Sequence, residues 1–135
     1  MAEAYLIQGF FFQQRQGLGV AMRPGEGAVA VVRRALYRDM FAGMFYRDPE
    51  SVMEGLSGEM TDRFGRSQIH HAQITDSLFS FTKHYASGGH AIYYRFSREG
   101  AIWVGNFSGE AAGRGQATCV TTLVSEELLQ PPRVP

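Results

Sequence analysis

The sequence is poor in cysteine and in long apolar runs, and it has no excess of charge of either sign. Its single cysteine, Cys119, excludes an internal disulfide and a zinc site built on several thiolates. No stretch approaches the roughly 18 consecutive apolar residues of a membrane-spanning helix. The 13 basic residues balance the 13 acidic ones, so no overall field attracts nucleic acid or an anionic membrane. We therefore expect no nucleic-acid partner and no membrane partner.

The length and composition are those of one folded domain. The chain has 135 residues, 44% of them apolar and 19% charged, which is enough apolar material for a buried core. We expect one domain over residues 1–125 and a proline-containing tail over residues 126–135. The first residues, MAEAYLIQG, lack the basic segment and apolar run of a secretory signal, so a cytoplasmic location is expected.

Short segments of alternating polarity, separated by glycine turns, follow one another along the second half of the chain. This spacing predicts strands at Val52–Thr61, Ser67–Thr75, Leu78–Tyr85, His90–Ser97, Ala101–Ser108 and Gln116–Val124. Two further strands are predicted before them, at Ala4–Gln13 and Phe41–Arg47. A meander of roughly eight strands is typical of a mainly β fold, here a single antiparallel β-barrel rather than a sandwich, because neighbours in sequence pair.

The segment Ala28–Met40 fits two structures. Apolar residues recur there at helical spacing, at Val29, Val32, Leu36 and Met40, which predicts one short helix across a mouth of the barrel. The valines and the preceding glycines also suit a strand, so both interpretations stay open, with the helix favoured.

The turn at Ser97–Gly100 predicts how the strands on either side of it pair. With Arg98, Glu99 and Gly100 as the loop, the register follows residue by residue. The predicted inward pairs are Phe96–Ile102, Tyr94–Val104 and Ile92–Asn106. The predicted outward pairs are Arg95–Trp103, Tyr93–Gly105 and Ala91–Phe107.

Aromatic residues and glycines alternate through three of the predicted strands. The patterns are Phe79-x-Phe81-x-Lys83-x-Tyr85, Ile92-x-Tyr94 and Gly100-x-x-Trp103-x-Gly105-x-Phe107-x-Gly109. They resemble the meander of calycin-type barrels, which include lipocalins, fatty-acid-binding proteins and avidins. The resemblance covers about half of the chain and implies an up-and-down barrel with a small apolar or amphipathic ligand. It transfers no site residue, and the Gly-x-Trp motif that lipocalins carry near the N-terminus is absent, because Trp103 is the only tryptophan.

Lys83 is the most suggestive polar residue, since it shares a strand face with Phe79, Phe81 and Tyr85. If that face is interior, a lysine among aromatic rings can hold a carboxylate or phenolate ligand. If Lys83 lies near the strand end, it reaches solvent over its apolar neighbours instead. The predicted ligand-binding residues are Lys83, Tyr85, Tyr94, Phe79, Phe81, Trp103 and Arg95.

The remaining polar residues form no recognised catalytic or metal-binding pattern. His70 and His71 are adjacent on one predicted strand, so they are expected on opposite faces and cannot share a metal inside a barrel. No nucleophile and base are spaced as a triad. We therefore predict no catalytic residue, no metal and no cofactor.

Three functions are compatible with these features. The first is a non-enzymatic binder of a small, partly hydrophobic ligand, with Lys83, Tyr85 and Tyr94 as polar anchors. The second is a filled barrel that acts as an interaction or oligomerisation module, with a homodimer formed through an exposed strand face. The third is a small isomerase or cyclase that moves protons inside the barrel. An internal cavity would separate the first and third functions from the second.

Overall fold

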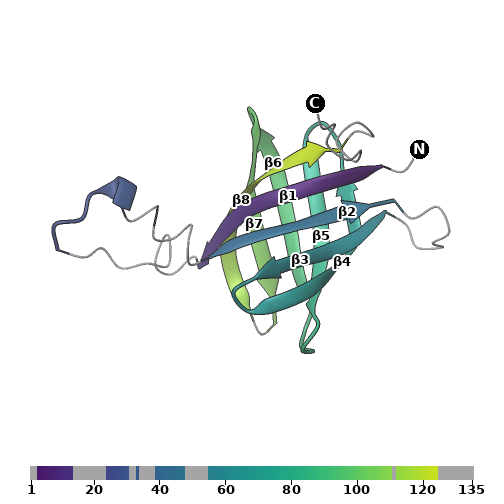
Figure 1. The fold of residues 1–135 in the computed structure, drawn as a ribbon, viewed down its shortest axis with the longest axis horizontal. Coiled ribbons are helices and arrows are strands. Elements are labelled where there is room, and N and C mark those ends of the chain that lie inside the picture. Colours follow the sequence, from purple (N-terminus) through teal and green to yellow (C-terminus); the bar gives the residue numbers. More distant parts are fainter. Residues whose placement is uncertain are drawn as a thin grey trace, which may run out of the picture.

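Eight strands in a computed structural model form one antiparallel sheet that closes on itself (Figure 1). The structure describes residues 3–13, 24–30, 33, 39–47, 55–110 and 112–124. Each strand pairs with the next, and β1 also pairs with β8, which closes the barrel. The prediction of a mainly β, eight-stranded meander barrel is confirmed. The strands are β1 (Ala4–Gln13), β2 (Met40–Tyr46), β3 (Leu56–Asp62), β4 (Gly65–Ile74), β5 (Leu78–Tyr85), β6 (Ile92–Glu99), β7 (Ile102–Gly109) and β8 (Gly113–Leu123).

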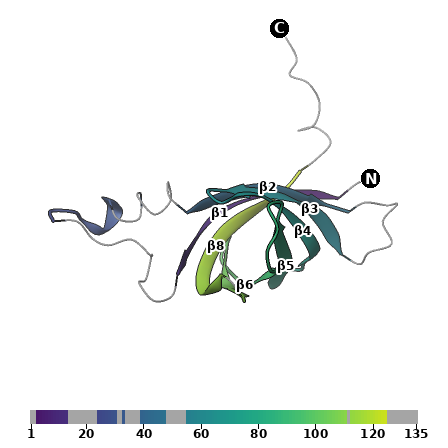
Figure 2. The ribbon, with the colours of Figure 1, turned by 90° about the horizontal axis from the view of Figure 1, so that it is seen from below.

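The alternation of side chains produces an apolar interior. Every second residue of a strand points inward, and the strands curve around a common core (Figure 2). Large aromatic side chains from β1, β2, β5, β6 and β7 occupy that core. The buried ones are Phe11, Phe41, Phe45, Phe79, Phe81, Tyr94, Phe96, Trp103 and Phe107.

These rings contact one another through the length of the interior. Phe79 stacks on Phe45 with 5.2 Å between ring centroids, and Phe81 stacks on Tyr94 at 4.7 Å. Tyr94 lies 5.5 Å from Phe107, whose ring meets Phe11 edge-on at 6.0 Å. Aromatic side chains therefore occupy much of the barrel interior.

The structure refines the predicted segment boundaries. Residues 28–30 and Arg33 are helical, and in Figure 1 this turn lies outside the barrel rather than across its mouth. Met40 belongs to β2, so a helix does not extend to it. The predicted strand Val52–Thr61 is observed from Leu56 onward, and its first residues, like the tail 126–135, lie outside the described residues. No helix among the described residues is long and apolar enough to span a membrane.

The predicted register between β6 and β7 is wrong. The loop of this hairpin is Gly100-Ala101, because Glu99 pairs with Ile102 and Gly100 has a φ of 62°. A glycine with positive φ at the first loop position is typical of a two-residue type II′ turn. The shorter loop moves the partners by three residues, and an odd shift reverses the face of β7.

The correct pairs explain the burial of β7. Tyr94 pairs with Phe107, Phe96 pairs with Gly105, and Trp103 pairs with Arg98 rather than with Arg95. Trp103 and Phe107 therefore point inward and are buried, whereas Ile102 and Asn106, predicted inward, are exposed. Tyr93 pairs with Ser108, so the aromatic residue opposite Gly105 is Phe96.

Candidate functional site

Lys83 lies inside the barrel, near the end of β5, and its side chain is 0% exposed. Its ammonium donates to three oxygens: Asp62 Oδ2 at 3.0 Å, Tyr85 Oη at 3.0 Å and Tyr94 Oη at 3.1 Å. A lysine has three N–H donors, and these three acceptors match them. The buried ammonium is therefore paired and fully hydrogen-bonded, as a charge in a protein interior must be.

Asp62 supplies the negative charge of this buried cluster. It is the last residue of β3, and its inward carboxylate is fully buried. Oδ2 accepts from Lys83 and from the hydroxyl of Tyr85 at 2.7 Å, while Oδ1 accepts from the backbone N–H of Phe64 at 2.8 Å. The carboxylate thus joins the β3–β4 turn to the end of β5, and Lys83 extends the hydrogen bonding to Tyr94 on β6.

The environment of the cluster shifts three pKa values. Burial lowers the pKa of Lys83, and the neighbouring charge of Asp62 opposes that shift. Burial and the nearby Asp62 carboxylate raise the pKa of Tyr85 and of Tyr94. Both phenols therefore keep their protons at neutral pH and act as hydrogen-bonding groups.

Aromatic rings surround the ammonium and close this end of the barrel. The Lys83 Nζ lies 4.6 Å from the ring centroid of Tyr85, 5.1 Å from that of Tyr94 and 5.6 Å from that of Phe11. Phe64, in the β3–β4 turn, packs on Phe11 and Tyr85 with 6.3 Å between centroids in each pair. We call Lys83, Asp62, Tyr85 and Tyr94 the buried polar cluster. Its contacts connect β5, β6 and the β3–β4 turn.

The structure brings six of the seven predicted site residues into one continuous group. Phe79 contacts Phe81 at 5.3 Å and Trp103 at 5.7 Å, and Phe81 stacks on Tyr94, which reaches Lys83. Trp103 Nε1 donates to Thr121 Oγ1 at 3.0 Å. Arg95, the seventh residue, lies on the outside of the barrel.

The predicted outward pair of Arg95 and Trp103 is therefore wrong, because Arg95 pairs with Asn106. The guanidinium over the Trp103 ring belongs to Arg98, 5.1 Å from its centroid.

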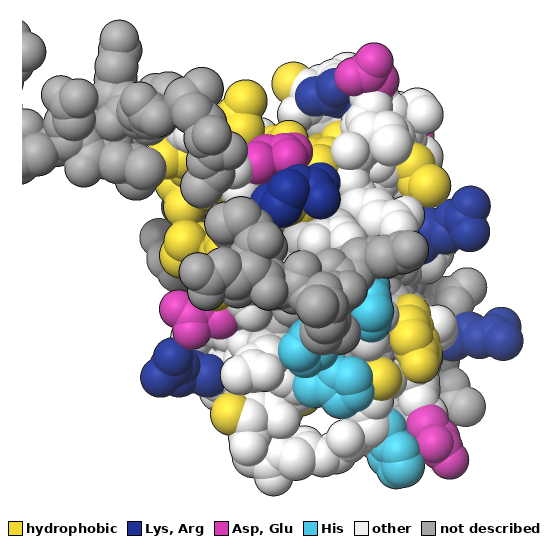
Figure 3. Space-filling view, turned by 90° about the vertical axis from the view of Figure 1, so that its right-hand side faces the viewer, with side chains coloured by type: hydrophobic (Ala, Val, Ile, Leu, Met, Phe, Trp, Pro, Cys, Tyr) yellow, Lys and Arg dark blue, Asp and Glu magenta, His cyan; other side chains and the backbone are white. Residues whose placement is uncertain are grey.

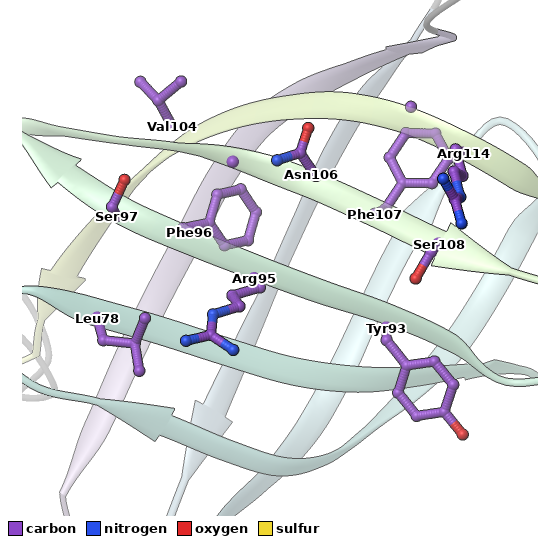
Figure 4. A pocket seen from close by; sticks show the side chains of 12 residues that line it. Leu78, Tyr93, Arg95, Phe96, Ser97, Val104, Asn106, Phe107, Ser108 and Arg114 are labelled. Atoms are coloured by element: carbon purple, nitrogen blue, oxygen red, sulfur yellow. The ribbon is translucent and has the colours of Figure 1, made fainter.

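Arg95 lies instead in a groove of about 760 Å³ on the outer surface of β5–β8 (Figure 4). Its outward side chains come from alternate positions of the strands, and we call it the outer groove. They are Leu78, Tyr93, Arg95, Ser97, Val104, Asn106, Ser108 and Arg114.

Two arginines and one tyrosine dominate the outer groove. Neither Arg95 nor Arg114 forms an ion pair within the part of the chain that the structure describes, and both side chains are exposed. The Tyr93 side chain is 58% exposed. The groove thus offers two unpaired guanidinium groups, a free aromatic face and several neutral hydrogen-bonding groups.

The sheet register sets the spacing of these groups. Tyr93, Ser108 and Arg114 lie in one row across β6, β7 and β8. Arg95 lies in the next row, two residues from Tyr93 on the same strand, opposite Asn106. Strand and residue spacings place the Cα atoms of the two arginines roughly 12 Å apart. Their long side chains can reach one small ligand that lies between them.

Histidine side chains gather on another face of the molecule (Figure 3). The rings of His70 and His84 are 5.6 Å apart, and His90 Nδ1 lies 3.2 Å from Glu110 Oε2. The expectation that His70 and His71 point to opposite faces is wrong. A bulge adds one residue to β4, so both histidines lie between the inward residues Ile69 and Ala72, and neither histidine is buried. His71, in the bulge, has a φ of 55°. Across the described ranges, no three His, Cys, Asp or Glu side chains are grouped as a metal site.

Sequence reasoning missed Asp62, Tyr93 and Arg114. Asp62 lies just beyond the predicted strand Val52–Thr61, and only its inward position at the strand end could have linked it to Lys83. Tyr93 and Arg114 are outward residues of β6 and β8, and they share a row only through the register of β7.

Neither family models, nor curated proteins, nor solved structures match this chain.

Proposed function

We propose that this protein is a non-enzymatic binder of a small amphipathic anion, which it holds in the outer groove. The observation that carries the proposal is that Arg95 and Arg114, which form no ion pair among the described residues, share one groove with the exposed Tyr93 ring. An arginine fork binds carboxylate or phosphate oxygens through two parallel hydrogen bonds, and an aromatic ring stacks on a flat apolar group.

The size and lining of the groove support a small molecule. Its volume of about 760 Å³ is within the range of roughly 300–1,000 Å³ that ligand sites have. Leu78 and Val104 add apolar surface, while Ser97, Asn106 and Ser108 add neutral hydrogen-bonding groups. A partly apolar ligand with an anionic group uses all three kinds of contact.

The packing and hydrogen bonding of the interior disfavour a ligand inside the barrel. Stacked rings occupy the interior, and all three Lys83 donors already have acceptors. A ligand carboxylate at Lys83 would have to displace Asp62 or a phenol. The isomerase or cyclase hypothesis faces the same difficulty, because it needs a base or acid that can reach a substrate.

Titration with 2-naphthoate, a flat apolar anion, tests the proposal, with the uncharged 2-naphthamide as a comparison ligand. Binding is measured by calorimetry and located by the amide chemical shifts of the protein. We expect naphthoate to perturb β6–β8 and to bind more tightly than naphthamide. Because a hydrogen bond to a charged group contributes about 1.5–3 kcal/mol, Arg95→Ala and Arg114→Ala should each weaken binding about tenfold or more.

Arg66→Ala is the matched control, since it removes an exposed arginine from β4 and should leave the affinity unchanged. Equal binding by wild type, Arg95→Ala and Arg114→Ala would contradict the proposal. Amide shift changes centred on Lys83, Tyr85 and Tyr94, with both arginine variants binding normally, would instead place the ligand in the interior.

A further inference from the structure

A continuous stretch of the barrel surface carries no charged side chain. It consists of the outward positions of β2 and of β1 up to Phe10, together with the outward positions of β7 and β8 at the end away from Arg114, and we call it the uncharged face. Its thirteen residues are Ile102, Val104, Thr118, Val120, Thr122, Ala4, Leu6, Gln8, Phe10, Met40, Ala42, Met44 and Tyr46.

Large apolar side chains on this face are accessible to solvent. Leu6 is 51% exposed, and Met40, Met44, Val120 and Ile102 are between 37% and 42% exposed. The register makes them neighbours: Leu6 pairs with Met44, and Gln8 pairs with Val120. A hollow of about 660 Å³, bordered by Arg33 from the β1–β2 connection, lies over Met40, Ile102 and Val120.

The extent of the face is comparable to that of the largest apolar patch on a typical monomer, and such patches are often functional. With strands about 4.8 Å apart and outward residues about 6.7 Å apart, thirteen positions cover roughly 400 Å² of sheet. Contiguous apolar patches of this size mark interaction sites in soluble proteins. A standard interface needs about 800 Å² from each partner, so the face can form the apolar centre of an interface, with the surface around it as the rim.

We propose that a second copy of this chain occupies the uncharged face, in a two-fold symmetric dimer. In such an interface the same patch meets itself, so any charge on the patch would approach its own like charge. A face without charged side chains avoids that repulsion and is complementary to itself. A charged partner would gain nothing there from electrostatic attraction.

Analytical ultracentrifugation of the full chain over a range of concentrations tests this assignment. We expect a reversible dimer, with twice the 15.0 kDa mass of the chain. Leu6→Lys and Val120→Lys each bury an unpaired charge on both sides of the interface and should weaken the dimer at least about a hundredfold. Gln68→Lys, which places a lysine on an exposed position of β4, should leave it unchanged.

Methionine methyl NMR locates the interface independently. The methyl signals of Met40 and Met44 should shift as the protein concentration rises, while that of buried Met60 should not. A chain that stays monomeric throughout overturns the proposal, and shielding of Met40 and Met44 in that monomer would assign the face to another segment of the same chain. A dimer that survives both lysine variants also overturns it, because it must use another surface.

Discussion

At the scale of single residues, the ion pair of Lys83 and Asp62 has a large energetic consequence. Both side chains are removed from water, so each depends on the other to compensate its lost hydration. Tyr85 adds a hydrogen bond to each of them.

We predict strong coupling between these two residues. Lys83→Met and Asp62→Asn should each lower the free energy of unfolding by about 3–5 kcal/mol, because each leaves the other buried group without its partner. The double variant should lose clearly less than the sum of the two single losses. Urea denaturation of the four proteins measures the coupling.

The exposed pair of Arg66 and Glu59 is the matched control for this cycle, at 3.0 Å but on the outer surface. Its coupling should be below about 1 kcal/mol, since water screens it. A coupling equally small for Lys83 and Asp62 would mean that water enters this end of the barrel.

The sequence predicted half of this pair. Alternation along Phe79–Tyr85 predicts that Lys83 shares a strand face with aromatic residues. Two environments were open for Lys83, the barrel interior and the solvent near the strand end, and the structure places it in the interior. The partner was not predictable from local pattern, because Asp62 is 21 residues away and reads as a turn residue. Only the β4 bulge and the β4–β5 register bring the two strand ends together.

At the scale of strands and turns, the β6–β7 hairpin depends on Gly105. A Cβ built there would collide with the carbonyl oxygen of Arg95 and would lie 2.6 Å from the Cα of Phe96. The absence of a side chain therefore lets β7 approach β6 while the Phe96 ring covers the gap.

We predict that Gly105→Ala destabilises the protein by about 1–3 kcal/mol, because neighbouring backbone must move to admit one methyl group. Thermal unfolding followed by circular dichroism measures the loss. Gly27→Ala serves as control, since no atom lies within 4 Å of a Cβ at that position. An equal change in stability in both variants would contradict the prediction, because it would show that the backbone around Gly105 admits a methyl group without loss of stability.

This hairpin also marks where sequence reasoning fails. Strand rhythm predicted β6 and its inward residues Tyr94 and Phe96 correctly, because the period of two is independent of the turn. The pairing with β7 depended on choosing between a three-residue and a two-residue loop around Gly100. Both loops accept a glycine there, so composition alone could not decide.

At the scale of the whole molecule, the filled barrel keeps several ionisable groups in their neutral form. Burial raises the pKa of Tyr85 and Tyr94, and it raises the pKa of Cys119 to about 12; the pKa of Tyr5, which also bonds Glu3, rises to about 12. In the unfolded chain a tyrosine loses its proton near pH 10. Above that pH the folded state holds more protons than the unfolded state.

Stability should therefore fall as the pH rises above about 10, by up to about 1.4 kcal/mol per pH unit for each group that stays protonated. Lys83 opposes this trend between its lowered folded pKa and its unfolded value near 10.4, but the phenols and the thiol outnumber it. Urea unfolding between neutral and alkaline pH should give a shallower decline for Tyr85→Phe than for wild type. Tyr93→Phe, which alters an exposed phenol, should follow wild type; identical slopes in all three proteins would contradict the assignment.

The closure of the barrel has a consequence for biosynthesis. The first strand to leave the ribosome, β1, has its second partner in the last one, through pairs such as Tyr5 with Leu123. Until β8 is translated, the nascent chain carries two open edges that can pair with strands of neighbouring chains. The barrel can therefore close only after β8 has been synthesised, and its edges are most exposed to aggregation in the interval between the synthesis of β1 and that of β8.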